Sequence, residues 1–208
     1  MAESDYPLWE RWNDYAIGLF LEGDTRGALV GFEKVAVLAP ESPEGPVNLA
    51  RVYLEEGQLS RAAVALDEAL RRSPGNLKVA WFRGEIFKAT GMYDEALKEW
   101  AKVYEVYPRD RVLLAGMGRV RYLMGDYQEA LRWIDLVLDI DPEDIGALYN
   151  RMLTLGALGR SEEQEEARAL YAYHKDDEDA LAVTAPYKRR HPVDNREAQP
   201  IHEHGLHR

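Results

Sequence analysis

Three stretches of the chain align without gaps: GQLSRAAVALDEALRRSP at 57–74, GMYDEALKEWAKVYEVYP at 91–108 and GDYQEALRWIDLVLDIDP at 125–142. Each stretch begins with Gly, has Ala five positions later and ends with Pro twelve positions after that Ala. The starting positions are 34 residues apart, from 57 to 91 and from 91 to 125. The same interval leads back to Gly23, Ala28 and Pro40, and forward to Gly159. An internal repeat therefore organises the chain.

This spacing predicts one helical hairpin per repeat. Gly adopts the positive φ that a tight turn requires, and Pro ends the second helix because it has no N–H and clashes with the preceding turn. Between them, apolar residues recur at intervals of three and four, as at Ala62, Leu66 and Ala69, which is typical of a helix with one buried face. A fixed period of this length indicates a solenoid, in which each hairpin packs on its neighbours.

Four consecutive repeats resemble the tetratricopeptide repeat (TPR) family, whose unit combines a bulky residue, small residues at fixed positions, an aromatic and a final Pro. The residues that carry the resemblance are Trp12, Ala16, Leu19, Gly23, Ala28, Phe32 and Pro40; Leu49, Ala50, Tyr53, Gly57, Ala62, Leu66, Ala69 and Pro74; Gly84, Phe87, Gly91, Ala96, Trp100 and Pro108; and Leu114, Met117, Gly118, Gly125, Ala130, Ile134 and Pro142. The resemblance covers about residues 9–142. It implies an all-α fold, a right-handed α-solenoid of antiparallel helix pairs (the TPR superhelix).

The expected organisation follows from these marks. The repeats span about 9–42, 43–76, 77–110 and 111–144, and an irregular fifth spans 145–175, where Ala167 and Tyr171 come about one helical turn late. Ser161 with Gln164 is typical of a capping box at a helix start. A frayed segment 1–8, a helical capping segment 176–190 interrupted at Pro186, and an extended His-containing tail 191–208 complete the prediction.

Composition restricts the function classes. The formal net charge of −11 argues against nucleic-acid binding, which relies on Lys and Arg clusters. The chain has no Cys, hence no disulfide framework or thiolate metal site. No segment approaches the roughly 20 apolar residues of a membrane-spanning helix, and no signal peptide precedes the first repeat. These features predict no membrane insertion and a cytoplasmic location as the sequence stands, or a periplasmic one if a signal has been removed.

The TPR resemblance implies a concave groove lined by the first helix of each repeat, which binds a peptide or a partner protein. Aromatic and Arg side chains dominate binding hot spots, and an Asn amide bonds a peptide backbone with both of its ends. Trp81, Phe82 and Tyr122 also have an alternative role, packing between neighbouring helices. The predicted groove residues are Asn13, Asn48, Arg51, Trp81, Phe82, Glu85, Lys88, Arg119, Tyr122, Tyr149 and Asn150.

No catalytic constellation is visible. Gly116-Met117-Gly118 lies inside a predicted helix and lacks the strand–turn–helix context of a nucleotide-binding loop. We therefore expect no enzyme and no cofactor. The predicted function is a non-enzymatic protein–protein interaction scaffold or adaptor that assembles or escorts a larger complex, with self-association left open.

All five His follow the four regular repeats, and His202, His204 and His207 fall within six residues. Imidazoles are common metal ligands, but structural sites have four fixed ligands, so no metal site is predicted. Residues 173–177, 191–192 and 199–204 are similar to the C-termini of bacterial TPR proteins that accompany, or are fused to, multihaem c-type cytochromes and related redox complexes. That second resemblance implies an alternative function, a subunit or assembly factor of a bacterial cytochrome-containing redox complex whose His-rich tail contacts metal or haem.

Overall fold

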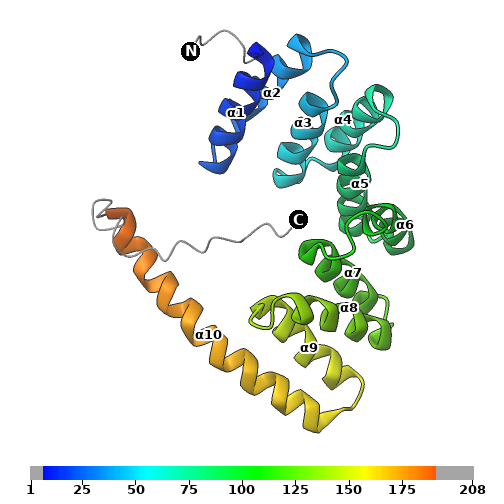
Figure 1. The fold of residues 1–208 in the computed structure, drawn as a ribbon, viewed down its shortest axis with the longest axis vertical. Helices are drawn as coiled ribbons and strands as arrows, with labels where there is room; N and C mark the ends of the chain where they lie inside the picture. The colour runs from blue at the N-terminus through cyan, green and yellow to red at the C-terminus, as the bar shows by residue number, and fades with distance from the viewer. Residues whose placement is uncertain (1–6, 191–208) are drawn as a thin grey trace. The chain divides into compact units, whose positions relative to one another are not determined.

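The computed structural model describes the backbone of residues 7–190 and the side chains of residues 7–175, and this part of the chain consists of α-helices joined by short turns and loops (Figure 1). Its helices are α1 (Leu8–Leu21), α2 (Thr25–Leu38), α3 (Glu44–Glu55), α4 (Leu59–Arg72), α5 (Leu77–Ala89), α6 (Tyr93–Tyr104), α7 (Arg111–Leu123), α8 (Tyr127–Ile140), α9 (Ile145–Ala157) and α10 (Ser161–Arg190). The predicted all-α solenoid of antiparallel helix pairs is confirmed.

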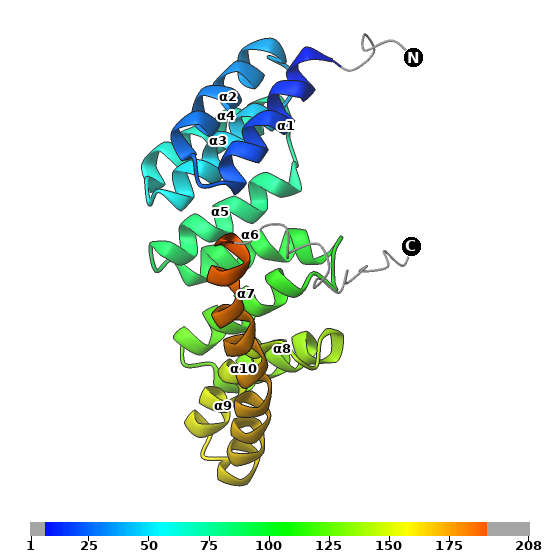
Figure 2. The same cartoon turned by 90° about the vertical axis from the view of Figure 1, so that its left-hand side faces the viewer.

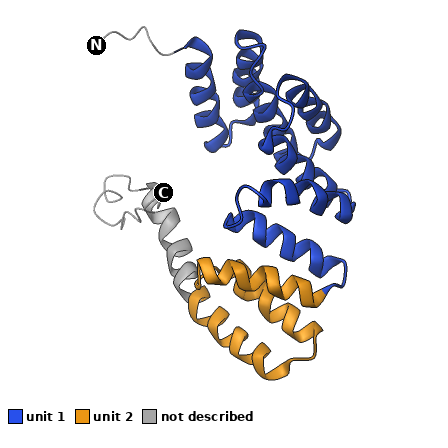
Figure 3. Cartoon of the chain, turned by 45° about the vertical axis from the view of Figure 1, so that its right-hand side comes forward, with its two compact units in different colours: residues 1–126 blue, residues 127–208 orange. Residues whose placement is uncertain are grey.

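The chain divides into two compact units, which Figure 3 colours separately. Unit 1, residues 1–126, holds α1 to α7, and unit 2, residues 127–208, holds α8 to α10. The boundary falls between the two helices of the fourth repeat. Each unit is therefore described by itself.

Unit 1 is built from three hairpins, α1 with α2, α3 with α4 and α5 with α6 (Figures 1 and 2). The turns contain Gly23, Gly57 and Gly91, with φ of 85°, 69° and 76°. Each of these glycines donates its backbone N–H to a carbonyl three residues back, as from Gly57 to Leu54 at 3.0 Å. Because a side chain is strained at such φ, only Gly makes this turn without cost.

The core of unit 1 runs from one hairpin into the next. One cluster of buried residues comes from α3, α4 and the start of α5: Val47, Ala50, Tyr53, Ala62, Leu66, Ala69 and Val79. A second cluster, from α1, α2 and α3, contains Ala16, Ala28, Phe32 and Val52. Since α3 contributes to both clusters, neither of the first two hairpins buries its apolar face alone, as expected for a solenoid.

The third hairpin has a large aromatic at its centre. Trp100 of α6 is fully buried, and its indole Nε1 donates to the backbone oxygen of Trp81 at 3.2 Å. The indole lies against Gly84, where an added Cβ would lie 2.7 Å from the Cε2 of Trp100 and closer still to two other ring atoms. Gly84 therefore permits the close approach of α5 and α6 that the repeat pattern predicts.

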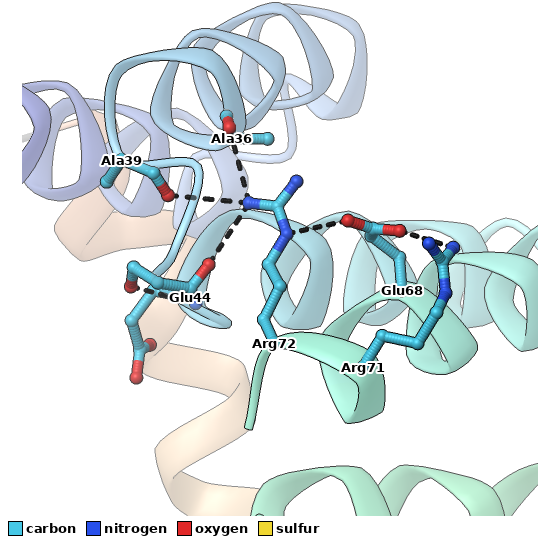
Figure 4. Close-up of polar contacts among 7 residues, drawn as sticks. Ala36, Ala39, Glu44, Glu68, Arg71 and Arg72 are labelled. Atoms are coloured by element: carbon cyan, nitrogen blue, oxygen red, sulfur yellow. Dashed lines mark hydrogen bonds and ion pairs between the residues drawn. The ribbon is translucent and has the colours of Figure 1, made fainter. Parts of the chain in front are cut away.

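Arg72 joins the second hairpin to the first, as Figure 4 shows. Its Nη1 donates to the backbone oxygens of Ala36, Ala39 and Ser42 at 3.3, 3.4 and 3.2 Å. These carbonyls lie at or just beyond the C-terminal end of α2, where backbone acceptors have no intrahelical partner and a cation is favourable. Arg72 Nε also donates to Glu68 at 2.7 Å, and this hydrogen bond holds the pKa of Glu68 below its ordinary value.

Replacing Arg72 by methionine is expected to lower the free energy of unfolding by about 1–2 kcal/mol, because the carbonyls lose a charged donor while the aliphatic stem stays. Urea unfolding monitored by circular dichroism measures the change. Arg71→Met is the matched control, since Arg71 pairs with the same Glu68 but is exposed, and a shift within about 0.5 kcal/mol is expected. Equal losses in the two variants would contradict a role for the carbonyl contacts.

Unit 2 has its own small core, a cluster of the buried residues Leu131, Leu155 and Ala167. Its helix α10 differs from the predicted capping arrangement, because one continuous helix runs from Ser161 to Arg190 where a separate segment 176–190, interrupted at Pro186, was expected. Residues 176–185 contain no Gly and several strong helix formers, so the helix continues through them. Pro186 removes a single backbone donor four residues before the helix ends.

Within residues 7–190, none of the helices has both the length and the apolar character that a bilayer-spanning segment requires.

Candidate functional site

The first helices of the first three repeats, α1, α3 and α5, border a hollow of about 750 Å³ in unit 1. A second hollow of about 580 Å³ adjoins it toward α7. Both are lined by Arg51, Trp81 and Phe82, so together they form one surface, which we call the groove. Other lining residues are Asn13, Ile17, Glu44, Val47, Asn48, Lys78, Tyr107 and Asp110 in the first hollow, and Phe20, Glu55, Glu85, Lys88 and Val112 in the second.

Two asparagines face one another across the groove floor. The Nδ2 of Asn48 donates to the Oδ1 of Asn13 at 2.8 Å, and Asn48 is 9% exposed. This bond joins α1 to α3 and fixes the orientation of both amides. It leaves the Oδ1 of Asn48 as an acceptor and the Nδ2 of Asn13 as a donor for a ligand backbone.

Most charges of the groove are already paired. Lys78 donates to both carboxylate oxygens of Glu44, at 2.7 and 2.9 Å, and Lys88 donates to Glu85 at 2.6 Å. Arg51 differs, since it forms no ion pair with any side chain in residues 7–175. Its guanidinium carbon lies 4.9 Å from the centre of the Phe20 ring. A carboxylate of a bound partner would therefore find its counter-charge at Arg51.

Trp81 and Phe82 form an aromatic wall of the groove, and Trp81 also packs against the core. Trp81 and Phe82 are half-buried and line both hollows. The ring of Trp81 stacks on that of Trp100, with centroids 5.9 Å apart and planes 28° apart. Trp81 therefore packs between helices, which is one of the two predicted alternatives, and it also borders both hollows, whereas its contact with a ligand stays a prediction.

The remaining predicted groove positions lie elsewhere. On α7, Arg119 is exposed and its guanidinium carbon lies 5.5 Å from the centre of the Tyr122 ring. Tyr149 and Asn150 belong to unit 2, where Tyr149 packs against Tyr171 of α10 with centroids 5.4 Å apart. The backbone oxygen of Asn150 accepts from the Thr154 hydroxyl at 2.7 Å. None of these residues is among those that line the two hollows.

Sequence reasoning missed several residues that line the groove. Glu44 and Lys78 are 34 residues apart, so they occupy equivalent positions in consecutive repeats with opposite charge. A separation of one repeat length together with opposite charge could have identified them as an ion pair that joins two consecutive repeats. Tyr107 and Asp110 lie between α6 and α7, outside the first-helix frame on which the prediction depended, and no comparable signal marks them.

The three tail histidines His202, His204 and His207 lie outside the described residues. Among the side chains of residues 7–175, no group of His, Asp and Glu is arranged to hold a metal ion.

Comparison with known proteins agrees with this architecture. The tetratricopeptide repeat profile matches residues 47–111 and 89–145. Residues 47–145 are tetratricopeptide repeats. Among solved TPR-like structures, PilF of Pseudomonas aeruginosa superimposes with a TM-score of 0.72 at 18% identity, over 88% of this chain and 92% of that one. MamA of Desulfovibrio magneticus has a TM-score of 0.66 at 16% identity, over 83% and 96%.

At the sequence level, the FK506-binding protein-like protein of Homo sapiens is 32% identical over 120 residues, which are 54% of this chain and 34% of that protein. The chain thus spans about a third of the length of that curated relative. The TPR fold is in general that of a protein–protein interaction scaffold.

Proposed function

We propose that this TPR protein holds a peptide or an extended segment of a partner protein in the groove, and thereby joins that partner to a larger complex. The observation that carries the proposal is the position of Arg51 with Trp81 and Phe82, where the two hollows adjoin. An unpaired cation beside two half-buried aromatics combines the residue types that contribute most to binding energy.

Each part of the groove has a role in this binding. The stacked ring of Trp81 and the ring of Phe82 offer apolar area to a side chain of the ligand. Arg51 binds a carboxylate of the ligand, either an acidic side chain or a chain terminus. Asn13 and Asn48 bond the ligand backbone through the amide groups that their mutual hydrogen bond does not use.

The pairing of Glu44 with Lys78 and of Glu85 with Lys88 supports the same assignment. Because these pairs occupy Lys78 and Lys88, Arg51 is the groove cation that is left, among residues 7–175, to bind a carboxylate of the ligand. Rim pairs of this kind contribute little binding energy themselves. These ion pairs disfavour a partner whose charged groups would compete for Glu or Lys, because binding such a partner would break the pairs.

Replacing Arg51 by glutamate is expected to weaken partner binding by about tenfold or more, because a carboxylate of the partner then meets a like charge. Partners are recovered from a host lysate on the immobilised chain, identified by mass spectrometry and purified, and their affinity is measured by calorimetry. The circular dichroism spectrum should be unchanged, because Arg51 is exposed.

Arg26→Glu is the matched control. Arg26 is also exposed, and it lies on α2, the second helix of its repeat. This variant makes the same change in net charge and should bind the partner as the unchanged chain does. Equal binding by all three proteins would show that the groove does not hold the partner.

A further inference from the structure

Helix α3 also borders a third hollow, which lies on the face of α3 opposite to the groove. Asn48 and Arg51 point to the groove, whereas Pro46, Leu49 and Tyr53 line the other hollow. Residues three, four and seven apart share one face of a helix, so these two sets occupy opposite faces of α3. This third hollow measures about 550 Å³ and is bordered by α2, α3 and α4. We call it the α2–α4 hollow.

The floor of the α2–α4 hollow is apolar. Ala36, Pro46, Leu49, Val64 and Ala65 line it. Val64 is 70% exposed although it lies in the middle of α4. Covering this side chain would remove apolar surface from water, which favours binding.

The rim of the α2–α4 hollow is cationic. It carries Arg61, Arg71 and Arg72 against the single carboxylate of Glu68, a net charge of +2, whereas the whole chain carries −11. Glu68 accepts from Arg72 and pairs with Arg71, as Figure 4 shows.

Arg61 is held in place by uncharged partners. It donates to the Tyr53 hydroxyl at 2.9 Å and to Gln58 at 2.7 Å, and its guanidinium carbon lies 4.2 Å from the centre of the Tyr53 ring. Its charge is therefore positioned without being compensated by a carboxylate. The Arg71 side chain is 74% exposed, so both cations can reach a ligand above Val64.

We propose that the α2–α4 hollow is a second docking site, which takes an acidic segment of a partner protein. One apolar side chain of that segment covers Val64, and carboxylates on either side of it bind Arg61 and Arg71. Charge complementarity selects this occupant, because a cationic rim around an apolar floor fits an apolar residue flanked by acidic ones. The site is independent of the groove, since it uses the other face of α3.

The test uses short random peptides displayed on phage and selected on the full chain. The selected peptides are expected to combine acidic residues with a large aliphatic or aromatic residue. For the strongest of them, Val64→Asp and Arg71→Glu should each weaken binding by about tenfold or more, and added salt should weaken it further. Val30→Asp is the matched control, because Val30 is an exposed valine on α2 outside the hollow, and it should leave binding unchanged.

A further variant separates this site from the groove. Arg51→Glu should leave the selected peptides bound if they occupy the α2–α4 hollow. Loss of binding in Arg51→Glu alone, peptides without acidic residues, or no selected peptide at all would overturn the proposal. The proposal would also be overturned if sedimentation experiments showed that the chain self-associates and that Val64→Asp abolishes this self-association. A second copy of the chain would then be the occupant.

Discussion

Replacing Trp100 by alanine is expected to lower the free energy of unfolding by about 3–5 kcal/mol. The side chain is fully buried at the centre of the third hairpin, so its removal leaves a cavity between α5 and α6. The backbone oxygen of Trp81 also loses the indole donor. Domains of this kind are stable by about 5–15 kcal/mol in total, so this one substitution removes a large part of the stability.

Urea unfolding monitored by far-ultraviolet circular dichroism measures the effect of Trp100→Ala. Tyr173→Ala serves as the control, because Tyr173 is a large aromatic that is exposed on α10. Its replacement should change stability by no more than about 0.5 kcal/mol. A loss below about 1 kcal/mol for Trp100→Ala would contradict the packing described for the third hairpin.

Replacing Gly84 by alanine is expected to destabilise the protein by about 1–3 kcal/mol, although alanine is the better helix former. The added Cβ would overlap the indole of Trp100. That ring has no room to move, because it is buried and hydrogen-bonded to α5. The overlap therefore outweighs the roughly 0.5–1 kcal/mol that alanine contributes in a helix interior.

Gly18→Ala provides the opposite expectation. Gly18 lies within α1, and an added Cβ there meets nothing within 4 Å, so this substitution should stabilise the protein by about 0.5–1 kcal/mol. The double variant Gly84→Ala with Trp100→Leu tests the cause, because leucine lacks the ring atoms that the new Cβ would meet. Gly84→Ala should cost less in that background, and an unchanged cost would refute the overlap as its origin.

The features of the fold that depend on the 34-residue period could be predicted from the sequence. Gly57 and Gly91 occupy turns with positive φ, and Ala62 and Ala96 are buried in the second helices that follow those turns. The same period places Asn13, Asn48, Arg51, Trp81 and Phe82 on first helices, and these residues share the groove. A repeat determines which helix faces meet, so residues in a fixed frame can be assigned to a face.

Other features depend on distances that no pattern encodes. Arg72 binds carbonyls 30 to 36 residues earlier in the chain, and nothing around Arg72 in the sequence identifies the C-terminal end of α2 as its partner. The pairing of Glu85 with Lys88 is a common spacing on helices, and it does not reveal that Arg51 is left without a carboxylate. The continuity of α10 differs from the sequence prediction because Pro186 indicates an interruption, whereas the helix formers before it carry the helix on to Arg190.

The bond between the Trp100 indole and the Trp81 backbone has a consequence for selectivity. The Trp81 side of the groove is joined directly to Trp100, a fully buried side chain of the third hairpin. A ligand that fits poorly cannot push this wall aside without disturbing the packing between α5 and α6. The wall is thus preorganised, so in the proposed function a ligand of matching shape would bind without the entropic cost of ordering it, and a ligand of another shape would be rejected because the wall is rigid.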